Sequence, residues 1–126
     1  MSDDVVVVGG GLAGYVAALS ATRSTPGASV TVLAEGDRFD LETGLIDVLG
    51  YDADGESVVA PLDAIDELPA EHPYARLGTD TVRDALSLFG DAVGEEYAGL
   101  DDPTNALFPT ATGGVTPAAG YPESFA

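Results

Sequence analysis

Residues Val5 to Gly14, VVVVGGGLAG, restrict the fold of this chain more than any other stretch. Four consecutive valines are typical of a short strand that is buried on both faces. The glycines that follow have the spacing G-x-G-x-x-G, and Leu12 to Thr22 is rich in Ala and Leu with no helix breaker. A buried strand, a glycine turn and a helix, in that order, form the context that the dinucleotide fingerprint requires. The motif therefore predicts a nucleotide-binding βαβ unit.

Each glycine of the motif has a physical role. Gly9 permits the tight turn, Gly11 lets a pyrophosphate approach the backbone, and Gly14 lets the helix pack close to the strand. The first N–H groups of the helix are unpaired and favour an anion. We therefore predict that the loop binds cofactor phosphates through Gly9, Gly10, Gly11, Leu12, Ala13 and Gly14. The alternative is a glycine turn in another α/β domain with no ligand.

A second strand is expected after the helix. Pro26 and Gly27 end the helix, and Ser29 to Ala34, SVTVLA, alternates and is β-branched. The crossover makes the two strands parallel. In dinucleotide-binding folds an acidic residue after this strand binds the ribose. Glu35 is the candidate, against the alternative of a solvated loop carboxylate. The predicted fold class is α/β, a Rossmann-like FAD/NAD(P)-binding start within an incomplete piece of a larger flavoprotein domain.

The apolar N-terminal stretch is neither a signal peptide nor a membrane anchor in this interpretation. Val5 to Ala21 is interrupted by a triple glycine and is short for a bilayer. Ser2, Asp3 and Asp4 precede it, whereas a signal peptide needs a basic region there. We therefore expect a cytoplasmic protein without direct membrane insertion.

The charge balance excludes several partners. The chain has 126 residues, with 22 acidic residues against four Arg and no Lys, for a net charge of −18. Such a charge repels nucleic acid and anionic lipid. An apolar fraction of 45% argues against disorder. An acidic surface without Lys is similar to the surfaces of proteins from salt-loving organisms. In those organisms molar salt, with a Debye length of ~3 Å, screens the repulsion among the acidic side chains. The absence of Cys excludes thiolate chemistry and Cys-ligated metal within the chain.

Two further segments carry candidate functional side chains. Gly44 to Tyr51, GLIDVLGY, is apolar except for Asp47. Asp47 lies either at an exposed edge or turn, or at a site that faces a flavin or a partner. His72 is the one histidine, and without a second ligand or a nucleophile it is expected to be a packed or surface residue beside a rigid turn.

The C-terminal half is predicted to combine one helix and one hairpin. Val82, Ala85, Leu86, Phe89 and Val93 share one stripe of an amphipathic helix over Thr79 to Val93. Thr79 or Thr81 is predicted to cap this helix, and Gly94 to end it. Pro61 to Leu68 is expected to form one or two helical turns.

A hairpin is predicted from Asn105 to Thr110 and Val115 to Thr116, around Gly113 and Gly114. Asp101, Asp102 and Asn105 are interpreted as turn residues, because they lack a closed set of metal ligands. The stretch from Ala118 to Ala126 is expected to contain no closing strand or helix. Residues 1–126 are expected to form a single nucleotide-binding domain, the N-terminal part of a longer flavoprotein.

Several motifs together carry a family resemblance. VVVVGGGLAG, GLIDVLGY, the HPY of residues 72–74, TDTVRDALSLF and NALFPTATGGVTPAAGYP occur in this order. This combination resembles the N-terminal portion of the B subunit of anaerobic glycerol-3-phosphate dehydrogenase, in its haloarchaeal form. The glycine motif is common to many flavoproteins, and the order of the later motifs is the specific part.

The resemblance implies an oxidoreductase subunit that works with a separate catalytic subunit and with a membrane-attached iron–sulfur subunit. Such a complex oxidises sn-glycerol 3-phosphate to dihydroxyacetone phosphate and passes electrons to the quinone pool, with the protein peripheral on the inner face of the membrane. The resemblance implies FMN, whereas the fingerprint favours the dinucleotide FAD. By match to the family, Gly9, Gly11 and Gly14 contact the flavin phosphates. Gly44, Ile46 and Asp47 match a family segment of no assigned role.

Two other functions fit the same residues. One is a generic nucleotide-binding module that uses NAD or FAD. The other is a non-catalytic assembly protein with a vestigial glycine turn. The catalytic residues are unknown from the sequence.

Overall fold

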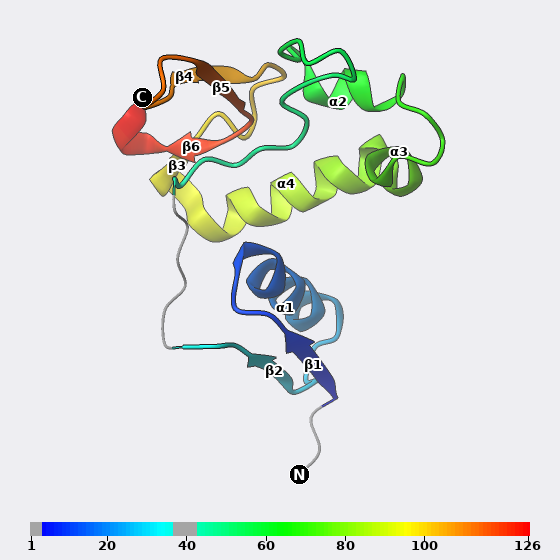
Figure 1. The fold of residues 1–126 in the computed structure, drawn as a ribbon. Helices are drawn as coiled ribbons and strands as arrows, with labels where there is room; N and C mark the ends of the chain where they lie inside the picture. Colours follow the sequence, from blue (N-terminus) through cyan, green and yellow to red (C-terminus); the bar gives the residue numbers. More distant parts are fainter. Residues whose placement is uncertain (1–3, 37–42) are drawn as a thin grey trace. The chain divides into compact units, whose positions relative to one another are not determined.

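A computed structural model describes residues 4–36 and 43–126 of the chain. The chain divides into two compact units, Met1–Thr43 and Gly44–Ala126 (Figure 1). The segment from Asp37 to Thr43 lies outside the described residues, except for Thr43.

The first unit is the predicted βαβ unit. Strand β1 (Val5–Val8) leads through the glycine turn into helix α1 (Leu12–Ser24), and strand β2 (Val30–Leu33) follows. The two strands are parallel and in register from Val5 opposite Val30 to Val8 opposite Leu33. Helix α1 contacts both strands. The prediction of a parallel βαβ start is confirmed.

The prediction that β1 is buried on both faces is wrong. Val5 and Val7 are half-buried, whereas Val6 is 50% and Val8 82% exposed. Side chains alternate between the two faces of a strand, so a pair of strands covered by one helix buries every second residue. Among the described residues β2 is the one strand that pairs with β1.

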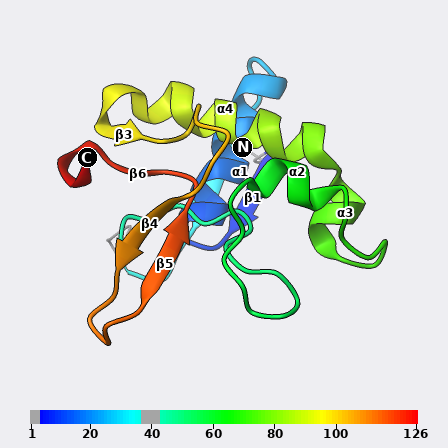
Figure 2. The same cartoon turned by 90° about the horizontal axis from the view of Figure 1, so that it is seen from above.

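In the second unit the helices precede the strands along the chain. Its helices are α2 (Pro61–Ile65), α3 (Pro73–Leu77) and α4 (Thr79–Val93), and a 3₁₀ turn (Gly94–Glu96) follows α4. The strands form two antiparallel pairs: β3 (Tyr97–Ala98) with β6 (Tyr121–Pro122), and β4 (Ala106–Pro109) with β5 (Val115–Ala118). A second 3₁₀ turn covers Glu123–Phe125. Figure 2 shows the β4–β5 hairpin projecting away from α4.

The core of the second unit joins segments that are distant in sequence. Its buried members are Val48, Leu49, Ile65, Val82 and Ala119. The Gly44–Tyr51 segment contributes Val48 and Leu49 to this core, and the backbone of Ile46 pairs with Gly120 in an isolated bridge. The apolar run GLIDVLGY is thus a core segment.

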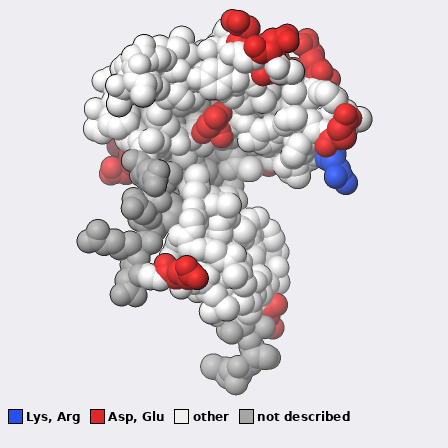
Figure 3. All heavy atoms as spheres, in the orientation of Figure 1, with Lys and Arg blue, Asp and Glu red and all other residues white. Residues whose placement is uncertain are grey.

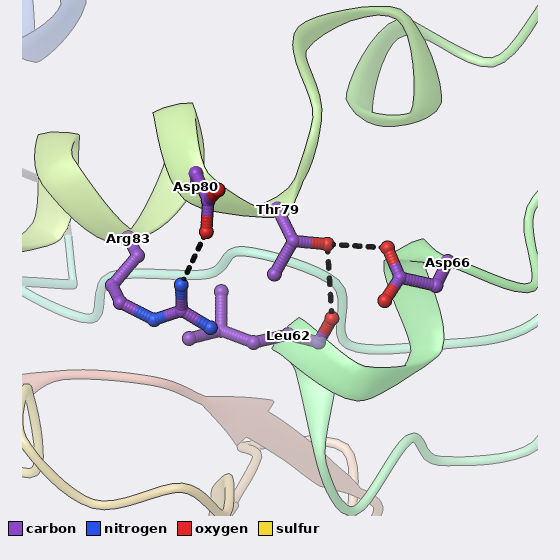
Figure 4. Close-up of polar contacts among 5 residues, drawn as sticks. All are labelled: Leu62, Asp66, Thr79, Asp80 and Arg83. Atoms are coloured by element: carbon purple, nitrogen blue, oxygen red, sulfur yellow. Dashed lines mark hydrogen bonds and ion pairs between the residues drawn. The ribbon is translucent and has the colours of Figure 1, made fainter.

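The predicted N-terminal cap of α4, Thr79 or Thr81, is wrong. Gly78 is the N-cap, with φ 83°, and none of the described side chains caps the helix. The Thr79 hydroxyl lies 2.7 Å from an oxygen of Asp66 and 3.5 Å from the carbonyl oxygen of Leu62, so it bonds to α2 and its C-terminal end instead (Figure 4). Gly78 also ends α3, and its positive φ turns the chain from one helix directly into the next.

The stripe of α4 is confirmed except for one member. Val82 is buried, Leu86 packs against the core, and the ring of Phe89 lies 5.2 Å from that of Tyr97. Ala85 is exposed, because it lies at the margin of the stripe. Gly94 ends the helix with φ 55°, as predicted.

The hairpin is confirmed, and the expectation for the C-terminal stretch is wrong. Strand β4 pairs with β5 from Ala106 opposite Ala118 to Pro109 opposite Val115. Beyond β5 the chain forms β6, which pairs with β3, and the final 3₁₀ turn. The strand β6 has only two residues, which is too short to produce a periodic pattern in the sequence. The ring of its Tyr121 lies 4.9 Å, centroid to centroid, from the ring of Phe108.

Candidate functional site

The glycine turn of the first unit lies beside an open hollow. The hollow has a volume of about 590 Å³ and is lined by Val8, Gly9, Gly10, Gly11, Leu33, Ala34 and Glu35. Its walls are the C-terminal ends of β1 and β2, where ligands bind in open α/β sheets. The fold therefore brings the glycine loop and Glu35 together, although they are separated by the whole of α1.

Two glycines of the motif are required by the fold itself. Gly9 has φ 132°, and its N–H donates to the carbonyl oxygen of Leu33 at 2.8 Å. A Cβ at Gly14 would overlap the carbonyl oxygen of Gly9, so α1 begins in direct contact with the turn. Gly10 is also restricted, because a Cβ there would overlap the Cβ of Ala34.

Gly11 differs from these three. A Cβ at Gly11 would meet no atom of residues 4–36 or 43–126 within 4 Å, and its φ of −90° suits any residue. Neither packing nor backbone conformation therefore explains glycine at this position. Gly11 lines the hollow, so the space that its missing side chain leaves open is available to a ligand. The residues present fit a pyrophosphate that approaches the backbone.

The first turn of α1 presents free amides. Gly11 is the N-cap in extended conformation, and no side chain in the described part of the protein caps the helix. The first helical hydrogen bond within the described part of the chain runs from the Tyr15 N–H to the Gly11 carbonyl oxygen at 3.1 Å. The N–H groups of Leu12, Ala13 and Gly14 therefore have no helical acceptor, and they lie at the positive end of the helix dipole. This is a ready site for a phosphate.

Asp47 lies in the second unit, on an otherwise buried segment. It is exposed between the buried Ile46 and Val48, and its carboxylate packs against Gly50. Burial of the surrounding segment nevertheless raises the pKa of Asp47. The pKa of the Tyr74 hydroxyl is raised by burial and then by the charge of Asp47.

His72 has a structural role. Its Nδ1 accepts a hydrogen bond of 3.2 Å from the Tyr74 N–H, so it caps α3. Its ring stacks on that of Tyr74 at a centroid distance of 5.8 Å. The sequence interpretation as a packed histidine is confirmed, while α3 itself was not predicted. A histidine directly before a proline, HPY, was the signal for a helix start with Pro at its first position.

Sequence reasoning also missed the role of Asn105. Its side-chain amide donates to the carbonyl oxygens of Leu49 and Val58 at 3.1 and 2.8 Å, and its backbone N–H donates to Val59 at 2.7 Å. Its Oδ1 is buried and accepts no hydrogen bond from the described residues. Asn105 therefore holds together two stretches that have no regular secondary structure.

The acidic residues before the hairpin form a turn, as predicted. The Asp102 carboxylate accepts hydrogen bonds from the backbone and hydroxyl of Thr104, which lower its pKa. Among the described residues, no group of three or more His, Asp or Glu could hold a metal ion. None of the helices in the described ranges is both long and apolar enough to cross a bilayer.

Comparison with known proteins identifies the family. A family model described as an FAD binding domain matches residues 4–124. The chain belongs to the FAD binding domain family. The fold class is therefore a Rossmann-like FAD-binding fold, and the match favours FAD over the FMN that the resemblance implied. It also favours a flavin over the generic NAD module.

Two similar proteins are named as the same enzyme subunit. The chain is 44% identical over 128 residues to a protein of Halobacterium salinarum named as the probable B subunit of anaerobic glycerol-3-phosphate dehydrogenase. It is 40% identical over 93 residues to the B subunit of anaerobic glycerol-3-phosphate dehydrogenase of Vibrio cholerae. This alignment covers 71% of this chain and 21% of the Vibrio protein. The chain spans 29% of the length of the Halobacterium protein, although all of the chain is matched. No solved structure matches the chain.

Proposed function

We propose that the first unit binds FAD, with the pyrophosphate on the backbone amides at the start of α1. The observation that carries this proposal is the contrast among the glycines of the motif. Gly9, Gly10 and Gly14 are explained by the fold, whereas Gly11 faces open space in the hollow. The family match to FAD binding domains supports the same cofactor.

Backbone amides suit a phosphate site in this protein. With four basic residues in a chain of net charge −18, few cations are available to attract a diphosphate. The helix N-terminus provides fixed partial positive charge and N–H donors in direct contact with the anion. Molar salt screens charges beyond ~3 Å but leaves such direct hydrogen bonds intact. In this proposal the free amides of Leu12, Ala13 and Gly14 bind the phosphates.

Glu35 is proposed to bind the ribose of the adenosine. It follows β2 and lines the same hollow as the glycine loop. A carboxylate is an acceptor-only group when ionised, so it can accept hydrogen bonds from both ribose hydroxyls. The same carboxylate would repel a 2′-phosphate.

For the whole protein we propose the activity that the names of the relatives state, anaerobic glycerol-3-phosphate dehydrogenase. The bound FAD would accept the two electrons that are removed from sn-glycerol 3-phosphate as it becomes dihydroxyacetone phosphate. The chain's residues would bind and orient the cofactor. We propose that residues 1–126 belong to a single nucleotide-binding domain.

The relatives are named as one subunit of their enzyme, so other subunits belong to the assembly. The proposed partners of this protein are a separate catalytic subunit and a membrane-attached iron–sulfur subunit. These partners would pass electrons to the quinone pool and hold the protein peripherally on the inner face of the membrane.

Substitution of Gly11 tests the cofactor site. In the protein that carries this chain, purified in molar KCl, Gly11→Val should abolish FAD binding, because the branched side chain would occupy the approach of the pyrophosphate. Ala17→Val, on the exposed side of the next turn of α1, is the matched control and should retain FAD. Flavin absorbance and mass analysis of the released cofactor measure the result. Unchanged FAD content in Gly11→Val would refute this placement.

Substitution of Glu35 tests the ribose contact. Glu35→Gln replaces an acceptor-only group by an amide and should weaken FAD binding by about tenfold, the equivalent of one charge-assisted hydrogen bond. The affinity for FMN, which lacks the adenosine, should stay the same. An equal loss for both flavins would show that Glu35 acts on the fold.

A further inference from the structure

The glycine loop and the end of β2 are joined by contacts that continue beyond the two strands. The N–H of Gly9, the first residue after β1, donates to the carbonyl oxygen of Leu33, the last residue of β2, at 2.8 Å. One residue further along each segment, the backbone of Gly10 lies against the side chain of Ala34. The loop is therefore fixed to the segment that leads into Glu35.

Ala34 is the residue that makes glycine necessary at position 10. Gly10 is not among the glycines with a positive φ, so backbone strain does not require glycine there. A Cβ at Gly10 would overlap the Cβ of Ala34 and would lie 3.4 Å from its Cα. Apart from the chain neighbours of Gly10, both described atoms within 4 Å of such a Cβ belong to Ala34. Since glycine cannot become smaller, a larger side chain at either position must push the loop and the strand end apart.

This contact lies between the two groups that are proposed to bind FAD. Gly10, Ala34 and Glu35 line the same hollow, and Ala34 is itself exposed, so it is not part of a packed core. Towards α1, the free amides begin two residues after Gly10, at Leu12. Beyond β2, Glu35 follows Ala34 directly. A shift at this contact therefore changes the separation between the phosphate donors and the ribose acceptor.

The placement of these groups is more important here than attraction by charge. On the face of the molecule shown in Figure 3, acidic side chains, in red, are spread over the surface, and basic side chains, in blue, are few. The chain as a whole has a net charge of −18. Its long-range field repels a diphosphate, so binding depends on short hydrogen bonds, which weaken steeply when the partners are misplaced.

We propose that Ala34 is a positioning residue for the cofactor. Its methyl group, in contact with Gly10, sets the separation between the amides of α1 and the carboxylate of Glu35. A dinucleotide needs both groups at once, because it carries a diphosphate next to a ribose, and a binding site must hold such groups within about 0.5 Å of the productive geometry. This inference rests on the proposed FAD site.

Exchange of one methyl group between the two positions tests the proposal. Gly10→Ala, Ala34→Gly and the double variant are made in the protein that carries this chain and purified in molar KCl. Gly10→Ala alone should lower the affinity for FAD at least about tenfold, equivalent to one charge-assisted hydrogen bond. In the Ala34→Gly background the added methyl group has room, and the same substitution should cost less than about threefold. Flavin fluorescence measures the affinities.

Glu35 provides a readout that a purely structural contact would not change. Glu35→Gln should weaken FAD binding about tenfold in the wild-type background but less than about threefold in Gly10→Ala, because the carboxylate is then already displaced. Ala17→Val, on the exposed side of α1, is the control and should leave the affinity unchanged. Unfolding temperatures identify any variant that does not fold. Should Gly10→Ala fail to fold, Ala34→Val enlarges the exposed partner and replaces it in the comparison with Glu35→Gln.

Two outcomes would overturn the inference alone, while the wild-type protein binds FAD. One is an equal loss of affinity from Gly10→Ala with and without the methyl group of Ala34. The other is an undiminished effect of Glu35→Gln in Gly10→Ala. Failure of the wild-type protein to bind FAD would refute the proposed cofactor site itself, and this inference with it.

Discussion

At the scale of single residues, glycines of one motif carry different constraints. A Cβ at Gly14 meets the carbonyl oxygen of Gly9, whereas a Cβ at Gly11 meets no protein atom. We expect Gly14→Ala to lower the free energy of unfolding by about 2 kcal/mol through overpacking. Gly11→Ala should leave stability within about 0.5 kcal/mol of wild type. Thermal unfolding in molar KCl measures both, and equal destabilisation by the two variants would contradict the assignment.

Asp47 supports a prediction about pH at the same scale. Its pKa is raised above the ordinary value of 3.8, so the folded state binds the proton more tightly than the unfolded state. The contribution of Asp47 to stability therefore falls as pH rises from 3.8 through the raised pKa, and the ionised group is penalised at neutral pH. Asp47→Asn should raise stability at pH 7 and remove this part of the pH dependence.

Asp54→Asn is the control for this prediction, because Asp54 lies in an exposed turn and its removal changes the net charge equally. Unfolding temperatures of both variants, measured from pH 3 to pH 8, provide the comparison. A gain in Asp54→Asn as large as that in Asp47→Asn would attribute the effect to net charge alone.

At the scale of elements, the short helix α3 depends on one side chain. His72 Nδ1 accepts from the Tyr74 N–H at the start of the helix. His72→Ala should cost about 1 kcal/mol of stability through loss of the cap, and His72→Asn should retain most of it, because Asn is a good N-cap residue. Chemical denaturation in molar salt measures the difference. If the two variants lose the same stability, stacking on Tyr74 is the main contribution of His72.

The elements that the sequence predicted are those with a local signal. The valines, the glycine spacing and the periodicity of Thr79–Val93 are contained within single segments, and these elements formed as expected. The hydrogen bonds of Asn105 join segments 47 and 56 residues apart, and no local pattern contains them. The hollow was predictable as a place, because the ends of parallel strands meet at one edge of a sheet. The exposure of Val8 was not predictable from the sequence, because it depends on which segments cover the sheet.

At the scale of the whole molecule, the net charge of −18 predicts salt dependence. Molar KCl shortens the Debye length to ~3 Å and screens the repulsion among acidic side chains. We expect the unfolding temperature to rise by about 10 °C between dilute buffer and molar KCl, equivalent to about 2 kcal/mol for a domain of this size. Circular dichroism follows the transition. Sucrose at equal osmolality is the control, and equal stability in dilute buffer would contradict adaptation to salt.

The open position beside Gly11 has a consequence for the history of such proteins. A lineage that stops using the cofactor loses the pressure on residue 11 and keeps the pressure on residue 14, because only residue 14 is held by the packing of the helix against the turn. Descendants with a degenerate site should therefore accumulate side chains at the middle glycine first. A homologue with a bulky residue there and an intact third glycine would be a folded protein that no longer carries a flavin.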